Sequence, residues 1–179
     1  SIRGSGPDAS LYWLSRMLEA GEDPLYIARR LIRVASEDVG LADPFALTLA
    51  MSAAQAYDYI GPPEAHLCLA QLTVYLAAAP KSNALYKAEK LVKQAIRNGS
   101  EPSVPYHLRN APTGLMRELG YGHEYRYPHD FKGNFVDENY FPEGLENSKY
   151  YEPGNNGREK QAAERLSQLW PRRYGVRKP

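Results

Sequence analysis

Apolar residues recur at every third or fourth position through most of the first hundred residues, which is the spacing of amphipathic α-helices. Short links bring consecutive helices side by side in opposite directions, so the pattern predicts a mainly α chain, built as a helical bundle or as stacked helical hairpins. The five predicted helices cover residues 7–21, 24–35, 44–60, 64–79 and 82–98, the last with Ser82 as its cap.

Two Asp-Pro pairs, Asp23-Pro24 and Asp43-Pro44, mark the starts of two of these helices. An Asp before a helix accepts hydrogen bonds from the first free backbone N–H groups, and Pro fits the first turn, which needs no donor. The helix between the pairs has a charged end at residues 36–38. The chain is therefore predicted to turn a sharp corner near Gly40.

The third and fourth predicted helices carry more apolar surface than two neighbours ordinarily cover. No charged residue occurs between Pro44 and Asp58, and the fourth helix is apolar on nearly all sides. One copy can bury this surface by placing the two helices in its middle. The composition favours instead a symmetric oligomer that buries it between subunits. The residues predicted for that interface are Tyr57, Tyr59, Leu67, Leu72 and Tyr75.

The composition changes after Gly99. One short helix is predicted over residues 112–119, and a long irregular segment rich in Tyr, Gly and Pro follows up to about residue 153. A last helix is predicted over residues 158–170, followed by a basic tail over residues 171–179.

Tyrosine is concentrated in this second part, which holds eight of the 14 tyrosines, from Tyr106 onward. A tyrosine ring can be buried while its hydroxyl finds a partner, so we expect these rings to pin the irregular segment onto a surface. The alternation Tyr125-Arg126-Tyr127 suits a short strand, with a turn at Lys132-Gly133-Asn134.

Bulk composition restricts the possible functions. The formal net charge is +1, so the chain is not a strongly basic protein. Its one cysteine, Cys68, allows no internal disulfide, which favours a reducing, cytoplasmic compartment. The longest uncharged run, residues 65–80, falls short of the roughly 20 residues of a membrane span. Without an initiator Met, the chain is expected to be a piece of a longer protein.

Catalytic motifs are missing from the sequence. It has no phosphate-binding G-x-x-x-x-G-K-[ST] loop, and it has neither G-x-S-x-G nor H-E-x-x-H, so we expect no catalytic residue and no cofactor in this chain. A hydrolase site within residues 107–129 is a minor alternative. His123 and His129 are either metal ligands or, more simply, hydrogen-bonded loop histidines, and no metal site is predicted.

The basic residues favour no single partner. Those around the fifth helix, Lys81, Lys87, Lys90, Lys93 and Arg97, are the best candidates for a DNA-binding face. The alternative is a solvated lysine-rich face, since Glu89 dilutes the patch. Arg33 is expected to pair with Glu37 one turn on. The terminal Arg172, Arg173, Arg177 and Lys178 either bind nucleic acid or keep the tail soluble.

Four long motifs occur in an order that resembles a known family. They are SLYWLSRMLEAGEDPLYIARRLIRVASEDVGLADP (Ser10–Pro44), APKSNALYKA (Ala79–Ala88), VPYHLRNAPTGLMRELGYG (Val104–Gly122) and NYFPEGL (Asn139–Leu145). They resemble the C-terminal region of the MgsA/RarA-type AAA+ ATPases, which are related to eukaryotic Werner-helicase-interacting ATPases. The run EKQAAERL at Glu159–Leu166 resembles the bacterial branch.

This resemblance implies a domain like the clamp-loader collar, which holds ATPase subunits together, as a tetramer in bacterial members. Residues 1–22 would then end the helical segment that follows the ATPase core, residues 23–170 would form the oligomerisation domain, and residues 171–179 the tail. The whole protein would hydrolyse ATP with Mg²⁺ in a core that this chain lacks. It would act on DNA at stalled forks, near the nucleoid, together with single-strand-binding protein.

Overall fold

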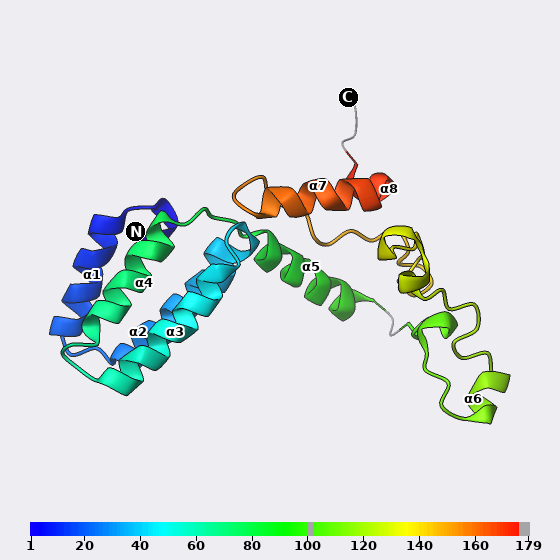
Figure 1. The fold of residues 1–179 in the computed structure, drawn as a ribbon, viewed down its shortest axis with the longest axis horizontal. Helices are drawn as coiled ribbons and strands as arrows, with labels where there is room; N and C mark the ends of the chain where they lie inside the picture. Colours follow the sequence, from blue (N-terminus) through cyan, green and yellow to red (C-terminus); the bar gives the residue numbers. More distant parts are fainter. Residues whose placement is uncertain (100–101, 176–179) are drawn as a thin grey trace. The chain divides into compact units, whose positions relative to one another are not determined.

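The computed structural model describes residues 1–99 and 102–175 (Figure 1). The described residues contain no β-strand, and the mainly α class predicted from the sequence is confirmed. The α-helices are α1 (Pro7–Glu19), α2 (Pro24–Val34), α3 (Phe45–Ile60), α4 (His66–Ala78), α5 (Ala84–Asn98), α6 (Gly114–Glu118), α7 (Glu159–Leu169) and α8 (Pro171–Tyr174). Short 3-10 turns occupy Ile2–Gly4, Gly40–Ala42, Tyr106–Leu108, Pro128–Asp130 and Lys132–Asn134, and a π-turn occupies Ala35–Val39.

The chain forms two compact units, and each is described by itself. Unit 1 holds Ser1–Glu89 with Tyr151–Ala163, and unit 2 holds Lys90–Tyr150 with Glu164–Pro179. The domain boundaries implied by the family resemblance remain predictions. They are residues 1–22, 23–170 and 171–179.

The two Asp-Pro pairs begin helices as predicted. The Asp23 carboxylate accepts a hydrogen bond from the Leu25 N–H at 2.9 Å, in the first turn of α2. The Asp43 carboxylate accepts from the Phe45 N–H at 3.2 Å, at the start of α3. Each Asp thus satisfies a backbone donor that the helix itself leaves unpaired.

The predicted corner near Gly40 is confirmed. The π-turn leads α2 into Gly40, whose φ of 52° is one that residues with a Cβ rarely adopt. A Cβ at this position would lie 2.9 Å from the Ser82 carbonyl oxygen. The corner is held from the other side by the Ser82 N–H, which donates to the Asp38 carbonyl at 2.8 Å.

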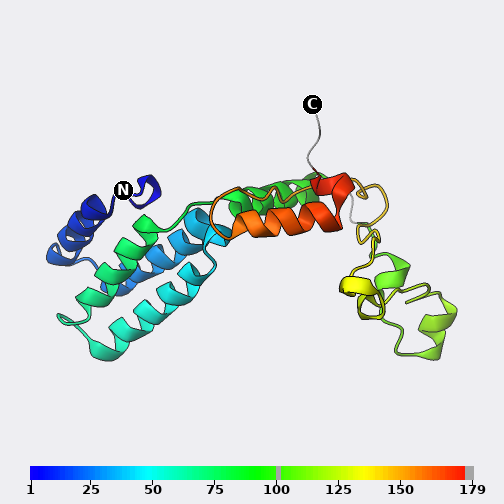
Figure 2. The ribbon, with the colours of Figure 1, turned by 45° about the horizontal axis from the view of Figure 1, so that its top comes forward.

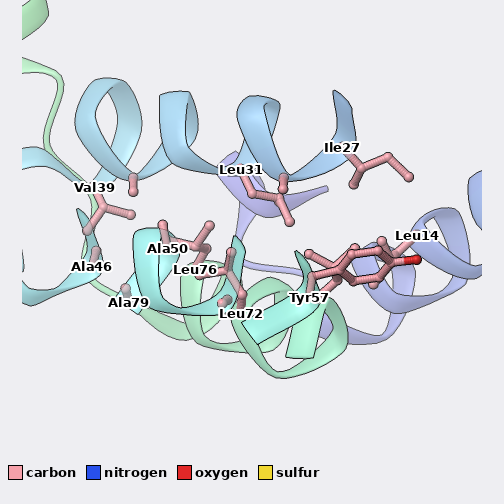
Figure 3. Close-up of a cluster of buried hydrophobic side chains, with 14 of the residues drawn as sticks. Leu14, Ile27, Leu31, Val39, Ala46, Ala50, Tyr57, Leu72, Leu76 and Ala79 are labelled. Carbon is pink, nitrogen blue, oxygen red and sulfur yellow. The ribbon is translucent and has the colours of Figure 1, made fainter. Parts of the chain in front are cut away.

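The core of unit 1 lies among α1, α2, α3 and α4. It combines large side chains such as Ile27, Leu31 and Leu76 with the small residues Ala46 and Ala50, as Figure 3 shows. Alanine on a buried face lets helix backbones approach closely. α4 packs against α1, α2 and α3, so the most apolar helix of the sequence is the central one. α3 and α4 lie side by side in both views (Figures 1 and 2).

A late segment of the chain, residues 151–158, returns to unit 1 and lies over the corner; we call it the strap. The Arg158 N–H donates to the Ala42 carbonyl at 2.8 Å, and the Asn156 amide donates to the Lys81 carbonyl at 3.0 Å. At its end Glu159 is buried and accepts a hydrogen bond from the Tyr151 hydroxyl at 2.7 Å. This return was not predicted from the sequence.

Unit 2 has little regular structure and is held together largely by aromatic rings. Trp170 packs edge-on against Phe135, with ring centroids 5.2 Å apart, and also contacts Tyr140. The Arg109 guanidinium lies over the rings of Tyr106 and Tyr121, at 4.3 and 5.0 Å from their centroids. Rings therefore do the packing that aliphatic side chains do in unit 1.

The predicted strand at Tyr125–Tyr127 is wrong. No neighbouring strand is present in the described part of the chain to accept its backbone hydrogen bonds, and Tyr127 instead leads into the turn at Pro128–Asp130. The predicted turn at Lys132-Gly133-Asn134 is present, with Gly133 at a φ of 71°. The predicted short helix is also present, as α6.

Candidate interaction surfaces

α3 turns three alanines and Tyr57 inward and leaves the opposite side of the helix exposed. Thr48, Ser52, Gln55 and Tyr59 are spaced by four, three and four residues, so they share one side of the helix, and all four are exposed. Tyr59 retains 93% of its accessible surface. None of these side chains carries a charge at neutral pH.

α4 exposes a stripe with the same spacing, formed by Leu67, Gln71, Val74 and Ala78. Leu67 is 75% exposed, although burying such a side chain is worth about 1.5–3 kcal/mol. We call the exposed stripes of α3 and α4 together the uncharged face. Solvated helix surfaces ordinarily carry charges, whereas surfaces buried in protein interfaces are depleted of Lys, Glu and Asp.

The residues predicted for an oligomer interface do not all lie on this face. Tyr59 and Leu67 belong to it. Tyr57 and Leu72 are buried in the core of a single copy, which corrects their predicted placement at a surface. They lie on the inward sides of α3 and α4, where Tyr57 stacks on the ring of His66 with centroids 5.9 Å apart.

Tyr75, the fifth predicted residue, is half-buried and joins α4 to the start of α3. Its hydroxyl donates a short hydrogen bond to the Asp43 carboxylate. That bond, with burial and the negative charge of Asp43, raises the pKa of Tyr75 to about 12. The ring also packs edge-on against Phe45, with centroids 6.3 Å apart. Tyr75 therefore has a role within one copy.

The predicted DNA-binding residues of α5 form one exposed side of the helix. Lys87, Lys90, Lys93 and Arg97 are separated by three, three and four residues, and Glu89, four positions before Lys93, borders this side. On the opposite side of α5, Leu85, Leu91 and Ile96 are also exposed, and Ala88 is its only buried residue.

Lys81 differs from the other predicted DNA-binding residues. Its ammonium group donates to the Ala77 carbonyl at 2.9 Å and to that of Ala79, at the C-terminal end of α4. Burial lowers the pKa of Lys81. A lysine held in this way stabilises the last carbonyl groups of a helix. The exposed basic side therefore consists of the four α5 residues alone.

Other basic residues are engaged in ion pairs. Arg33 binds Glu37 at 2.8 Å, as predicted, and this hydrogen bond lowers the pKa of the Glu37 carboxyl. Arg29 lies 3.3 Å from Asp23. Near the C-terminus, Arg173 donates to the Glu146 carbonyl at 2.7 Å. The predicted tail residues Arg177 and Lys178 lie outside the described residues.

Three of the four histidines lie in the irregular second part of the chain, and His66 lies in α4. His107 Nε2 lies 3.1 Å from the Asn139 carbonyl oxygen, His123 lies 4.0 Å from the Glu124 carboxylate, and the His129 ring packs beside Tyr127. Within residues 1–99 and 102–175, no group of three or more His, Cys, Asp and Glu side chains is placed to hold a metal ion. In the same ranges, no helix is both long and apolar enough to cross a membrane.

The fold and its surfaces define a mainly α domain whose helices pack through small residues and leave an uncharged face exposed. The chain belongs to the family described as "MgsA AAA+ ATPase C terminal", whose model matches residues 4–170.

Several named proteins are similar to this chain. Replication-associated recombination protein A of Haemophilus influenzae is 52% identical over 170 residues, covering 94% of this chain and 38% of that protein. The Escherichia coli protein of the same name is 50% identical with the same coverage. ATPase WRNIP1 of Dictyostelium discoideum is 46% identical over 85% of this chain and 18% of its own length. The chain thus spans about two fifths of the length of these bacterial relatives.

Proposed function

We propose that this chain is the oligomerisation and scaffold domain of a DNA-dependent AAA+ ATPase that acts in replication and recombination. The observation that carries the proposal is the uncharged face of α3 and α4. It exposes large side chains such as Leu67 and Tyr59, which a second copy would shield from water. Membership of the family and the names of the relatives support the setting in replication-associated recombination.

The proposed role is mechanical. Domains joined through α3 and α4, as a tetramer in line with the resemblance, would hold several ATPase cores on one DNA. ATP and Mg²⁺ would bind in those cores, outside this chain. Cooperation between subunits would then depend on contacts made by this domain, although ATP hydrolysis would take place in the ATPase cores.

The oligomeric state of the purified chain tests this proposal. We expect an oligomer in light scattering coupled to size exclusion, and we expect Leu67→Glu to shift it to monomers, because the substitution would bury a charge in the interface. Leu115→Glu, on α6 in unit 2, is the matched control, since Leu115 is similarly exposed at 66%. A strict monomer at tens of micromolar, or equal effects of the two variants, would contradict the proposal.

A second candidate function, DNA binding through α5, is favoured by its exposed basic side. Four cations on one side of a helix suit contacts with successive phosphates, and such binding weakens as salt concentration rises. We expect Lys90→Glu to weaken DNA binding and to reduce its salt dependence. Lys160→Glu, an equal charge change at an exposed position of α7, should have a smaller effect. Equal affinities of the parent chain and Lys90→Glu would exclude this role.

A further inference from the structure

One stretch of unit 2, residues 123–135, has an unusual composition. Its sequence, HEYRYPHDFKGNF, contains four aromatic residues and two histidines but no Ala, Val, Leu, Ile or Met. Surfaces that bind proteins through hydrophobic contacts ordinarily mix aromatic with aliphatic side chains. Rings without aliphatic neighbours suit instead a ligand that is itself made of flat rings.

Three of these rings are exposed. Tyr127 retains 52% and Tyr125 48% of its accessible surface, and Phe131 is also exposed. The fourth, Phe135, packs against Trp170 and so anchors the stretch to the rest of unit 2. The three exposed rings therefore belong to a segment that is anchored at one end by Phe135.

Nitrogen-bearing groups lie against these rings. The Arg126 guanidinium lies over the Phe131 ring, 4.8 Å from its centroid, and the His129 imidazole lies 5.1 Å from the Tyr127 ring. Two of the three exposed rings therefore each have a nitrogen-bearing group packed against them.

We propose that Tyr125, Tyr127 and Phe131, with Arg126 over the Phe131 ring, form a stacking site for the bases of a single-stranded nucleic acid. We call this set the ring platform. Aromatic faces bind bases of any sequence by stacking, and an arginine within such a site adds a cationic contact. Paired bases in a duplex are stacked on each other and cannot reach these rings, so the ligand is single-stranded.

The charges of the stretch distinguish this site from the basic side of α5. Arg126 and Lys132 are balanced by Glu124 and Asp130. Binding to the ring platform should therefore depend mainly on base stacking and vary little with salt, whereas phosphate binding by α5 varies strongly. The two sites share no residue, and the ring platform does not require subunit assembly.

The test measures binding of the chain to a fluorescein-labelled oligothymidylate by fluorescence anisotropy. Tyr127→Ala should weaken binding at least about 5-fold, the lower limit for loss of one stacked base. Tyr127→Phe keeps the ring and should bind like the parent chain. Tyr26→Ala is the matched control, because Tyr26 is an exposed tyrosine beside an arginine, Arg29, in unit 1.

A strand with the same backbone but without bases completes the test. Stacking on the ring platform requires that Tyr127→Ala and the parent chain bind this abasic strand equally. The proposal is overturned if the parent chain does not bind the oligothymidylate, or if Tyr127→Ala binds it as well as the parent does. It is also overturned if Tyr127→Ala loses as much affinity for the abasic strand, which would mean that the tyrosine acts on the backbone or on the fold.

Discussion

Asp43 joins two helices of unit 1, α3 and α4, through a single side chain. One of its carboxylate oxygens begins α3 by accepting the Phe45 N–H, and the other accepts the Tyr75 hydroxyl from α4. The sequence predicted the first of these bonds from the Asp-Pro pair. It did not predict the second, because Tyr75 lies 32 positions further along the chain. Local chemistry is visible in a sequence, whereas contacts between distant residues depend on how the helices pack.

The bond between Tyr75 and Asp43 predicts a loss of stability in strong alkali. The pKa of Tyr75 is about 12 in the folded chain, above the value of 10.0 for a free tyrosine, so folding favours the protonated phenol. This stabilisation is complete below about pH 10 and is lost as pH rises through about 12. The difference in free energy of unfolding between the parent chain and Tyr75→Phe, measured with urea, should shrink over this range. Tyr86→Phe is the control, and a difference that does not change with pH would contradict the prediction.

At the scale of elements, the helices of unit 1 were predictable, but the side that α3 turns inward was not. The periodicity of apolar residues and the caps are local signals, so α1 to α5 lie close to their predicted positions. On α3, the rows Ala46–Ala50–Ala53–Tyr57 and Leu47–Met51–Ala54–Asp58 have the same spacing. The structure buries the first, smaller row, which lets α2 and α4 approach closely. Tyr57 belongs to this row, so it is buried with the alanines and does not lie at the surface where it was predicted.

The elements of unit 2 were less predictable, because a segment held by rings has no periodicity. Gly and Pro correctly indicated turns and the absence of long helices. The alternation of Tyr125, Arg126 and Tyr127 was misleading, since a strand also needs a partner strand. The clearest signal in this region was composition, but it was only partly informative. Tyr140 packs against Trp170, whereas Tyr125 and Tyr127 stay about half exposed and do not pin the segment as predicted.

At the scale of the whole chain, the strap makes unit 1 discontinuous in sequence. Residues 151–158 complete a unit that otherwise ends at Glu89, and Gly157 lies at the tightest point. Its φ is 53°, and an added Cβ would collide with the Ala42 carbonyl oxygen and with Pro80. The strap therefore requires a glycine there for both conformation and space.

We accordingly expect Gly157→Ala to displace the strap. The free energy of unfolding should fall by more than about 1 kcal/mol, because the native conformation suits only glycine. Limited proteolysis should cut within residues 151–158 faster than in the parent chain. Gly144→Ala in unit 2 is the control, since Gly144 also has a positive φ, 86°, but has open space around it. Equal cleavage of the parent chain and Gly157→Ala would contradict this account of the strap.

The uncharged face also has a consequence for handling the chain in solution. With a net charge of +1 and an isoelectric point near 7.8, copies repel each other only weakly around neutral pH. Electrostatic repulsion between copies of like net charge normally limits nonspecific association through exposed apolar surfaces. Purification away from the isoelectric point, at moderate ionic strength, should therefore favour ordered assembly over precipitation.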